Sequence, residues 1–209
     1  MMCLKTIGST GSTVEAQEDY KINDYNGAKF KAYIGTSYAW CSSTGNVFSK
    51  KVTSKDLIVK SYNETYGSGY TATAALIGGS AAAAKNYNTL PANSSKCTGW
   101  FLPSAGQYYA VMSQLGGGIY PDNWEINQNF GNATIVTKNI NNKLEKVGDS
   151  NYTEFFGDIN TWAWTSSEFS STDAVLIDSC VDDLKVSGSV RFLIISKTSQ
   201  NQVRPFLAF

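Results

Sequence analysis

Apolar residues recur at helical spacing in the middle of the chain and alternate in short runs towards its end. Within residues 104–116 they fall on one helix face: Tyr108, Val111, Met112 and Leu115. Ser104 and Gln107 form the S-x-x-Q pattern of a capping box, and Gly116 follows as a stop signal. The pattern predicts a helix over residues 105–115.

Two further segments have helical patterns. Ser80–Tyr87 is rich in alanine, and Ser80 is positioned as its N-cap, which predicts a helix over residues 81–87. Thr137–Val147 places three apolar residues on one face, Ile140, Leu144 and Val147, ahead of a glycine. We expect the first two helices, 81–87 and 105–115, to be the principal ones.

Short apolar runs predict strands in two parts of the chain. Early candidates are Lys29–Ile34, which alternates polar and apolar residues, and Asp56–Lys60. Later candidates are Trp162–Ser166, Ala174–Asp178, Val190–Ile195 and Gln202–Phe209. Helices followed by a late set of strands favour an α+β class. We expect one domain over residues 27–209, preceded by an irregular polar arm or linker over residues 1–26.

The composition limits the partners and the location of the protein. Its 209 residues include 17 basic and 17 acidic side chains, so no net charge favours nucleic acid or an anionic membrane. Charged residues make up only 16%, which leaves a surface of Ser, Thr, Asn and Gly, typical of a binding surface or an extracellular protein. No run approaches the ~20 apolar residues of a membrane span. Met1–Lys5 does not resemble a signal peptide. We expect a cell-surface or phage-virion protein, exported without a cleavable signal or part of a longer chain.

The absence of histidine excludes several kinds of catalytic site. No Ser-His-Asp triad, Cys-His dyad or imidazole base can form, and metal sites lose their commonest ligand. The four cysteines have no metal-binding spacing, and buried free thiols are favoured over a disulfide such as Cys41–Cys97. We therefore expect no catalytic residue, no metal site and no cofactor.

Several residues are expected to hold irregular backbone in place. Trp100 and Trp164 are large enough to pin loops to the core, and Pro103 fixes the turn into the helix. Glu168 and Arg204 are predicted to form an ion pair between a loop and the terminal strand. The alternative role of Glu168, a catalytic carboxylate, lacks a visible partner.

Three motifs in order give the chain a family resemblance. They are Gly99-Trp100-Phe101-Leu102-Pro103-Ser104 with Gln107, then Trp164-Thr165-Ser166-Ser167-Glu168, then Val203-Arg204-Pro205-Phe206. Together with the run Gly69–Ile77 and the alanine-rich helix, they resemble the bacterial DUF1566 branch of the C-type lectin fold. Ala72, Gln107 and Ala163 depart from its usual residues. The resemblance implies a short, twisted, mainly antiparallel sheet with two principal helices, and adjacent chain ends.

The resemblance also implies a function. Variable proteins of diversity-generating retroelements use this fold, bind a ligand through a diversified C-terminal surface, and end in a tail like Arg204–Phe209. By this resemblance the surface would lie between Phe169 and Val186, with contributions from Ser196–Asn201, and would bind a protein or glycan. The candidate ligand-binding residues are Phe169, Ser171, Thr172, Asp173, Val175, Ile177, Ser179, Cys180, Asp182 and Asp183.

Other functions of the same fold remain alternatives. A structural module of a bacterial surface protein, fimbria or phage fibre would need no selective ligand. An enzyme of the formylglycine-generating type needs paired cysteines late in the chain, where only Cys180 lies. Calcium-dependent sugar binding needs E-P-N or Q-P-D and W-N-D motifs, which the sequence lacks.

Overall fold

The computed structural model describes residues 3–4, 38–43, 45–62, 69–86, 98–117, 124–129, 131–146, 161–181 and 188–208. Within these ranges the main sheet has four strands in the order β2-β5-β4-β3, with every neighbouring pair antiparallel. A second, parallel pair joins β1 to β6. The strands are β1 (Cys3–Leu4), β2 (Gly131–Asn132), β3 (Thr161–Glu168), β4 (Asp173–Val181), β5 (Gly188–Ser196) and β6 (Leu207–Ala208).

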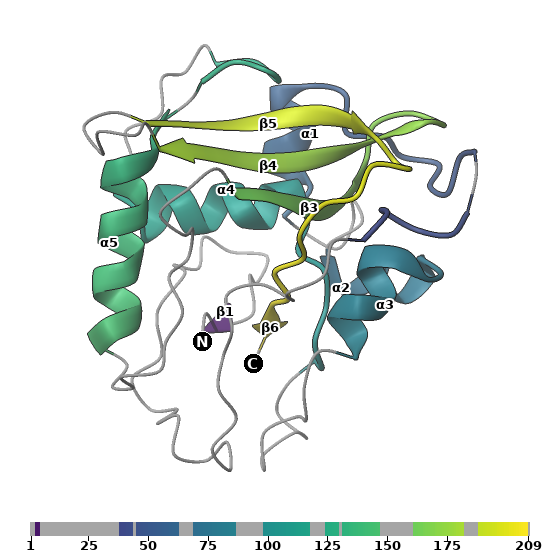
Figure 1. Cartoon of the computed structure of the whole chain (residues 1–209), viewed down its shortest axis with the longest axis horizontal. Helices are drawn as coiled ribbons and strands as arrows, with labels where there is room; N and C mark the ends of the chain where they lie inside the picture. The colour runs from purple at the N-terminus through teal and green to yellow at the C-terminus, as the bar shows by residue number, and fades with distance from the viewer. Residues whose placement is uncertain are drawn as a thin grey trace.

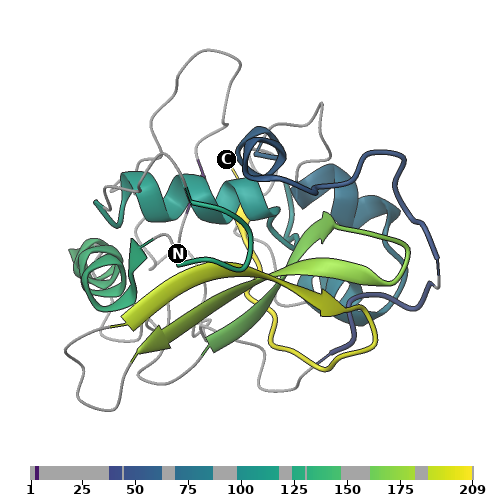
Figure 2. The ribbon, with the colours of Figure 1, turned by 90° about the horizontal axis from the view of Figure 1, so that it is seen from above.

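Helices accompany the main sheet (Figures 1 and 2). They are α1 (Lys55–Lys60), α2 (Gly69–Ala75), α3 (Gly79–Lys85), α4 (Ala105–Gln114) and α5 (Ala133–Lys146). Figure 2 shows α4 running along one face of the sheet, with α5 at one end of it. The predicted α+β class and the mainly antiparallel sheet are confirmed.

Each face of the sheet carries its own apolar cluster. On one face, Val175, Ile177 and Phe192 pack with residues of α4 and α5. On the other, Trp164 and Leu176 pack with Trp40 and with α3. β4, which pairs with β3 and β5, is therefore buried on both faces.

The capping box of α4 is confirmed. The Ser104 hydroxyl accepts from the Gln107 backbone N–H at 3.2 Å, and the Gln107 amide oxygen accepts from the Ser104 N–H at 2.8 Å. The same oxygen accepts from the Gly69 N–H at 3.1 Å, so one side chain also fixes the first residue of α2. The left-handed residue after α4 is Gly117, with φ of 62°, rather than the expected Gly116.

The strand expected over Asp56–Lys60 is wrong, because these residues lie in α1. The hydroxyl of Ser54 caps that helix by accepting from the Leu57 N–H at 3.4 Å. Ile58 is its buried residue, so one helix face rather than alternate residues points inward. α1 packs closely on α4, where an added Cβ at Gly106 would meet the backbone of Ile58, Ser61 and Tyr62.

Two helix boundaries and one whole helix also differ from the sequence-based expectations. α3 begins at Gly79 after the N-cap Gly78, and Ser80 instead donates its hydroxyl to the Trp40 carbonyl at 2.6 Å. α5 begins four residues before Thr137, where the Asn132 side chain accepts from the Ile135 N–H at 3.1 Å. α2 falls in a run for which no helix was predicted.

The end of the chain, expected as a strand over residues 202–209, is less regular than predicted. Of the expected strand 202–209, only Leu207–Ala208 forms β6, while Gln202 and Phe206 make isolated bridges to Ala163 and Phe101. β1, which falls within the arm expected to be irregular, pairs with β6 and brings Cys3–Leu4 beside Leu207–Ala208. The expected strand 29–34 lies outside the described residues, as does most of the arm 1–26.

The two tryptophan anchors are confirmed. Trp164 is fully buried and Trp100 is 6% exposed. The Trp164 indole N–H donates to the Tyr38 carbonyl at 2.7 Å, and the Trp40 indole N–H donates to the Thr165 carbonyl at 2.7 Å. Pro103 is buried, and its carbonyl accepts from the Ser166 N–H at 2.9 Å. None of the helices described is long and apolar enough to cross a membrane.

Candidate functional site

The binding surface predicted on β4 needs a correction. The side chains of Val175, Ile177 and Ser179 are at most 1% exposed. The first two belong to the core cluster under α4 and α5. β4 is flanked by strands on both sides and covered on both faces, so none of these three positions reaches a ligand. Cys180 lies in β4 opposite Ser189, its side chain is not described, and Asp182 and Asp183 lie outside the described residues.

The remaining predicted residues form the tip of the β3–β4 hairpin, Phe169–Asp173. Ser171 and Thr172 are exposed, and Phe169 and Asp173 are half-buried. Hydroxyls of Thr172 and Ser170 donate to the Asp173 carboxylate at 2.7 and 2.8 Å and lower the pKa of that carboxyl. These hydrogen bonds lie within the turn itself, and Ser171 and Thr172 remain exposed to solvent.

The turn after β5, residues 196–200, lies against the hairpin tip. The Lys197 backbone N–H donates to the Thr172 carbonyl at 2.9 Å, and its side chain donates to the Ser171 carbonyl at 2.9 Å. Ser196, Thr198 and Gln200 are exposed. The structure thus brings together the tip and this turn, two segments that were predicted to share one surface.

A buried carboxylate holds this tip to the rest of the protein. Glu168 is 1% exposed and accepts from the backbone N–H groups of Val47 and Phe48 at 2.8 and 2.7 Å. Its two oxygens also accept from Lys51 and, at 2.5 Å, from Lys197. Lys197 is itself buried and lies 5.0 Å from the centre of the Trp40 ring. We call this set of contacts the Glu168 clamp.

The Glu168 clamp corrects the expected ion pair with Arg204. The ion-pair partners of Glu168 are Lys51 and Lys197, while the Arg204 carbonyl accepts from the Tyr108 hydroxyl at 3.4 Å. Burial alone raises the pKa of Glu168, but hydrogen bonds from Lys197, Lys51 and the backbone together outweigh it and leave that pKa below 4.5. Glu168 is therefore charged at neutral pH and joins three segments of the chain.

Cys41 is a buried free thiol, as expected, and burial raises its pKa. Cys97, the other half of the disulfide considered, lies outside the described residues.

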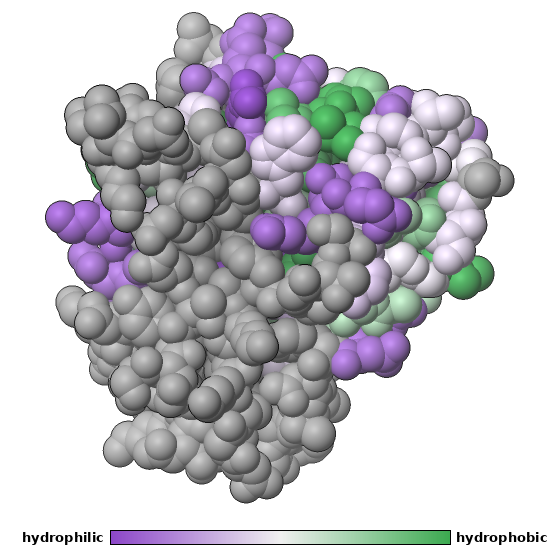
Figure 3. Space-filling model, viewed as in Figure 1, coloured by the Kyte–Doolittle hydropathy of each residue, from purple (hydrophilic) through white to green (hydrophobic). Residues whose placement is uncertain are grey.

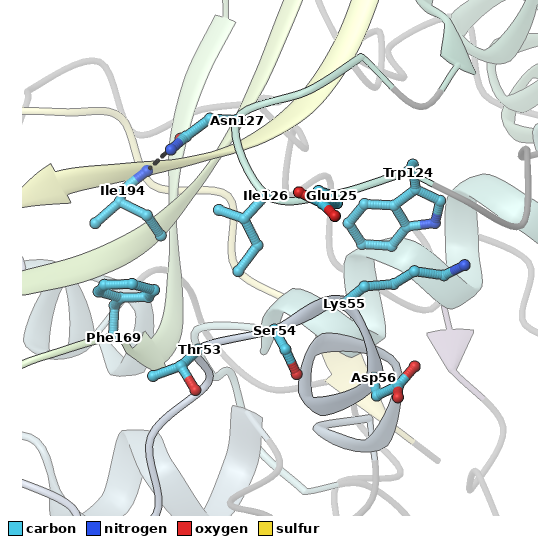
Figure 4. A pocket seen from close by; sticks show the side chains of 10 residues that line it. All are labelled: Thr53, Ser54, Lys55, Asp56, Trp124, Glu125, Ile126, Asn127, Phe169 and Ile194. Atoms are coloured by element: carbon cyan, nitrogen blue, oxygen red, sulfur yellow. Dashed lines mark hydrogen bonds between the residues drawn. The ribbon is translucent and has the colours of Figure 1, made fainter.

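A groove opens beside the hairpin tip (Figure 4). Its volume is about 620 Å³, within the ~300–1,000 Å³ of typical ligand sites. Four separate parts of the chain line it: residues 53–56 at the start of α1, the loop 124–127, Phe169 after β3, and Ile194 on β5. The lining residues are Thr53, Ser54, Lys55, Asp56, Trp124, Glu125, Ile126, Asn127, Phe169 and Ile194.

We call the end of the groove at Phe169 and Ile194 the apolar end and the end at Trp124 the aromatic end. In Figure 4, Phe169 and Ile194 lie at one end, Trp124 and Lys55 lie at the other, and Ile126 lies between them. Phe169, Ile126 and Ile194 are only partly buried, so apolar surface remains available to a ligand. On the face shown in Figure 3, apolar surface gathers in the upper part of the view, where Figure 1 draws β5.

The loop 124–127 is fixed to the edge of β5 by Asn127. This residue has a left-handed backbone, with φ of 68°. Its backbone N–H donates to the Phe192 carbonyl at 2.8 Å, and its side-chain oxygen accepts from the Ile194 N–H at 3.2 Å. Asn127 thus acts as a one-residue extension of the sheet and gives the groove a fixed wall.

The groove walls could not be predicted from the sequence, because they come from segments far apart in the chain. The roles of Lys51 and Lys197 were not predicted either. A motif glutamate preceded by small residues indicates burial and hence a cationic partner, but the sequence offers 17 basic residues from which to choose. In the ranges described, no three His, Cys, Asp or Glu side chains gather as a metal site would require.

Comparisons with known proteins add little to this picture. No family model matches the chain, and no curated protein matches it. A solved fimbrial protein from Bacteroides ovatus is similar over 54% of this chain, with 23% identity and a TM-score of 0.26. The chain spans 17% of the length of that protein. A likeness this slight carries no argument about fold or function.

Proposed function

We propose that the protein binds a ligand in the groove between α1, the loop 124–127 and the hairpin tip, and does not catalyse a reaction. The observation that carries the proposal is a groove of about 620 Å³ in which the apolar side chains of Phe169, Ile126 and Ile194 stay partly exposed beside polar residues. Ligand sites are typically apolar clefts with a few polar groups that fix orientation. Phe169 links the groove to the surface expected from the sequence.

The family expectation stays part of this proposal. A C-type lectin-like scaffold is supported by the adjacent chain ends, the buried tryptophans of two motifs and the antiparallel sheet. A retroelement variable protein would carry replaceable residues on such a scaffold. The exposed residues of the tip and of the turn 196–200 suit that role, because substitutions at exposed positions usually change stability by less than ~0.5 kcal/mol.

Replacing Phe169 with alanine should weaken ligand binding about ten- to a hundredfold, since burying an apolar side chain of this size contributes about 1.5–3 kcal/mol. The measurement is an NMR titration of the isotope-labelled protein with two probe sets, blocked tripeptides and monosaccharides. In the unaltered protein, we expect saturable shifts at the amides of Ile126, Asn127 and Ile194.

The matched control is Ile135→Ala, which removes an apolar side chain that is 54% exposed on α5, away from the groove. It should leave the titration unchanged. If no probe shifts the groove amides, or if shifts cluster elsewhere, the groove is not the ligand site. A structural module would then be the better interpretation.

A further inference from the structure

The aromatic end of the groove is already covered by a cation. The Lys55 ammonium group lies 5.7 Å from the centre of the Trp124 ring. Trp124 is 2% exposed, with Tyr109 and Phe192 packed on it at ring-centre distances of 5.6 and 5.9 Å. Attraction between a cation and an indole face is favourable, and tryptophan is the best of the aromatic residues for it. The groove thus holds a lysine side chain of its own.

The groove lining carries more negative than positive charge. Its charged residues are Lys55, Asp56 and Glu125, so Lys55 leaves an excess of one negative charge. Asp56 and Glu125 are exposed, and neither carboxylate makes a hydrogen bond or ion pair with other residues in the described part of the chain. Figure 4 shows the two acids on opposite walls, Asp56 beside Lys55 and Glu125 beside Trp124. Lys55 thus occupies the position on the Trp124 ring, near the two carboxylates, that a cationic group of a ligand would take.

We infer that the groove binds a peptide segment of a partner protein through a lysine side chain that takes the place of Lys55. The inference rests on the proposed function and names its ligand. The internal occupant is itself a peptide lysine, which favours the same chemistry in the partner. The other end, with Phe169 and Ile194, suits an apolar residue of that segment placed near the lysine.

Charge distinguishes a cationic ligand from an acidic one. A cationic ligand competes with Lys55 and is attracted by Asp56 and Glu125, whereas an acidic ligand would need Lys55 as its partner. Replacing Lys55 with alanine should therefore tighten binding of a lysine peptide, by about two- to fivefold for one exposed charge. The same substitution would weaken an acidic ligand.

The probes are three blocked tripeptides: acetyl-Leu-Gly-Lys-amide and its counterparts with norleucine or glutamate in place of lysine. Each is titrated at low salt, and binding is followed by NMR at the Trp124 indole and the Ile194 amide. We expect the lysine peptide to bind most tightly and the glutamate peptide least. Glu125→Gln and Asp56→Asn should each weaken the lysine peptide about two- to fivefold. Added salt should weaken it too, since screening acts on exposed charges. Lys60→Ala, the same charge change on α1 outside the groove, is the control and should change nothing.

Four outcomes overturn the inference. Tighter binding of the glutamate peptide, lost in Lys55→Ala, would make the groove an anion site. Binding of pentylammonium as tightly as the lysine peptide would mean a small organic amine rather than a peptide. Groove shifts with monosaccharides or uncharged peptides, but none with the lysine peptide, would reject this inference and leave the proposed function standing. If no probe shifts the NMR signals of the groove residues, the proposed function is rejected as well.

Discussion

Replacing Glu168 with alanine is expected to lower the free energy of unfolding by about 3–5 kcal/mol, the usual cost of breaking a buried ion pair from one side. The substitution leaves the buried Lys197 ammonium group without its anion and removes the acceptor of the Val47 and Phe48 N–H groups. Urea unfolding followed by circular dichroism measures the change. Glu125→Ala, which removes an exposed glutamate, should stay within about 0.5 kcal/mol of the unaltered protein.

The Glu168 clamp also makes stability depend on pH. The folded-state pKa of Glu168 lies below 4.5, so folding favours its charged form. The stabilisation is complete above the ordinary pKa of 4.5 and is lost as the pH falls through the lower, folded-state value. Urea midpoints measured between pH 7 and pH 2 should fall less steeply in Glu168→Gln. Parallel acid profiles for the two proteins would show that the clamp contributes nothing, as would a loss below 1 kcal/mol in the alanine variant.

Replacing Ile177 with alanine should cost about 2–5 kcal/mol, because the side chain is fully buried and its removal leaves a cavity. Ile177 lies on β4 between Ala163 of β3 and Phe192 of β5. The same substitution at Ile135, which is 54% exposed on α5, should change stability by less than about 0.5 kcal/mol. Thermal and urea unfolding of the two variants would measure the difference.

This pair of variants tests whether β4 belongs to the core or to a ligand surface. If β4 carried a variable surface, the Ile177→Ala variant would be as stable as the Ile135→Ala variant. Equal stability of the two would therefore restore the surface first expected from the sequence and contradict the burial of Val175 and Ile177.

The parts of the fold that were predicted correctly rest on local signals. The capping box of Ser104 and Gln107 specifies the start of α4 by itself, and the apolar stripe behind it needs no knowledge of the partner. Trp100 and Trp164 were predicted to be buried from their size and their place in motifs, but size alone does not decide burial, since Trp162 is 43% exposed. The strands after residue 161 also show in their own composition.

The errors arise where the surroundings override local composition. Leu57-Ile58-Val59 is typical of a strand, yet the Ser54 cap and the packing of α1 on α4 make it helical. Ser, Asp and Val along β4 are typical of a half-exposed strand, but the apolar clusters on both faces of the sheet bury them. The groove shows no motif at all, because Lys55, Trp124 and Phe169 meet only after folding.

The Glu168 clamp has a consequence for protein engineering. It anchors the hairpin tip and the turn 196–200 from beneath, through Lys197, while the side chains above them take no part in it. Ser171, Thr172, Thr198 and Gln200 are therefore positions at which a library could be randomised on a constant backbone. Such a library would sample new recognition surfaces next to an existing groove, with selection acting on affinity rather than on recovery of the fold.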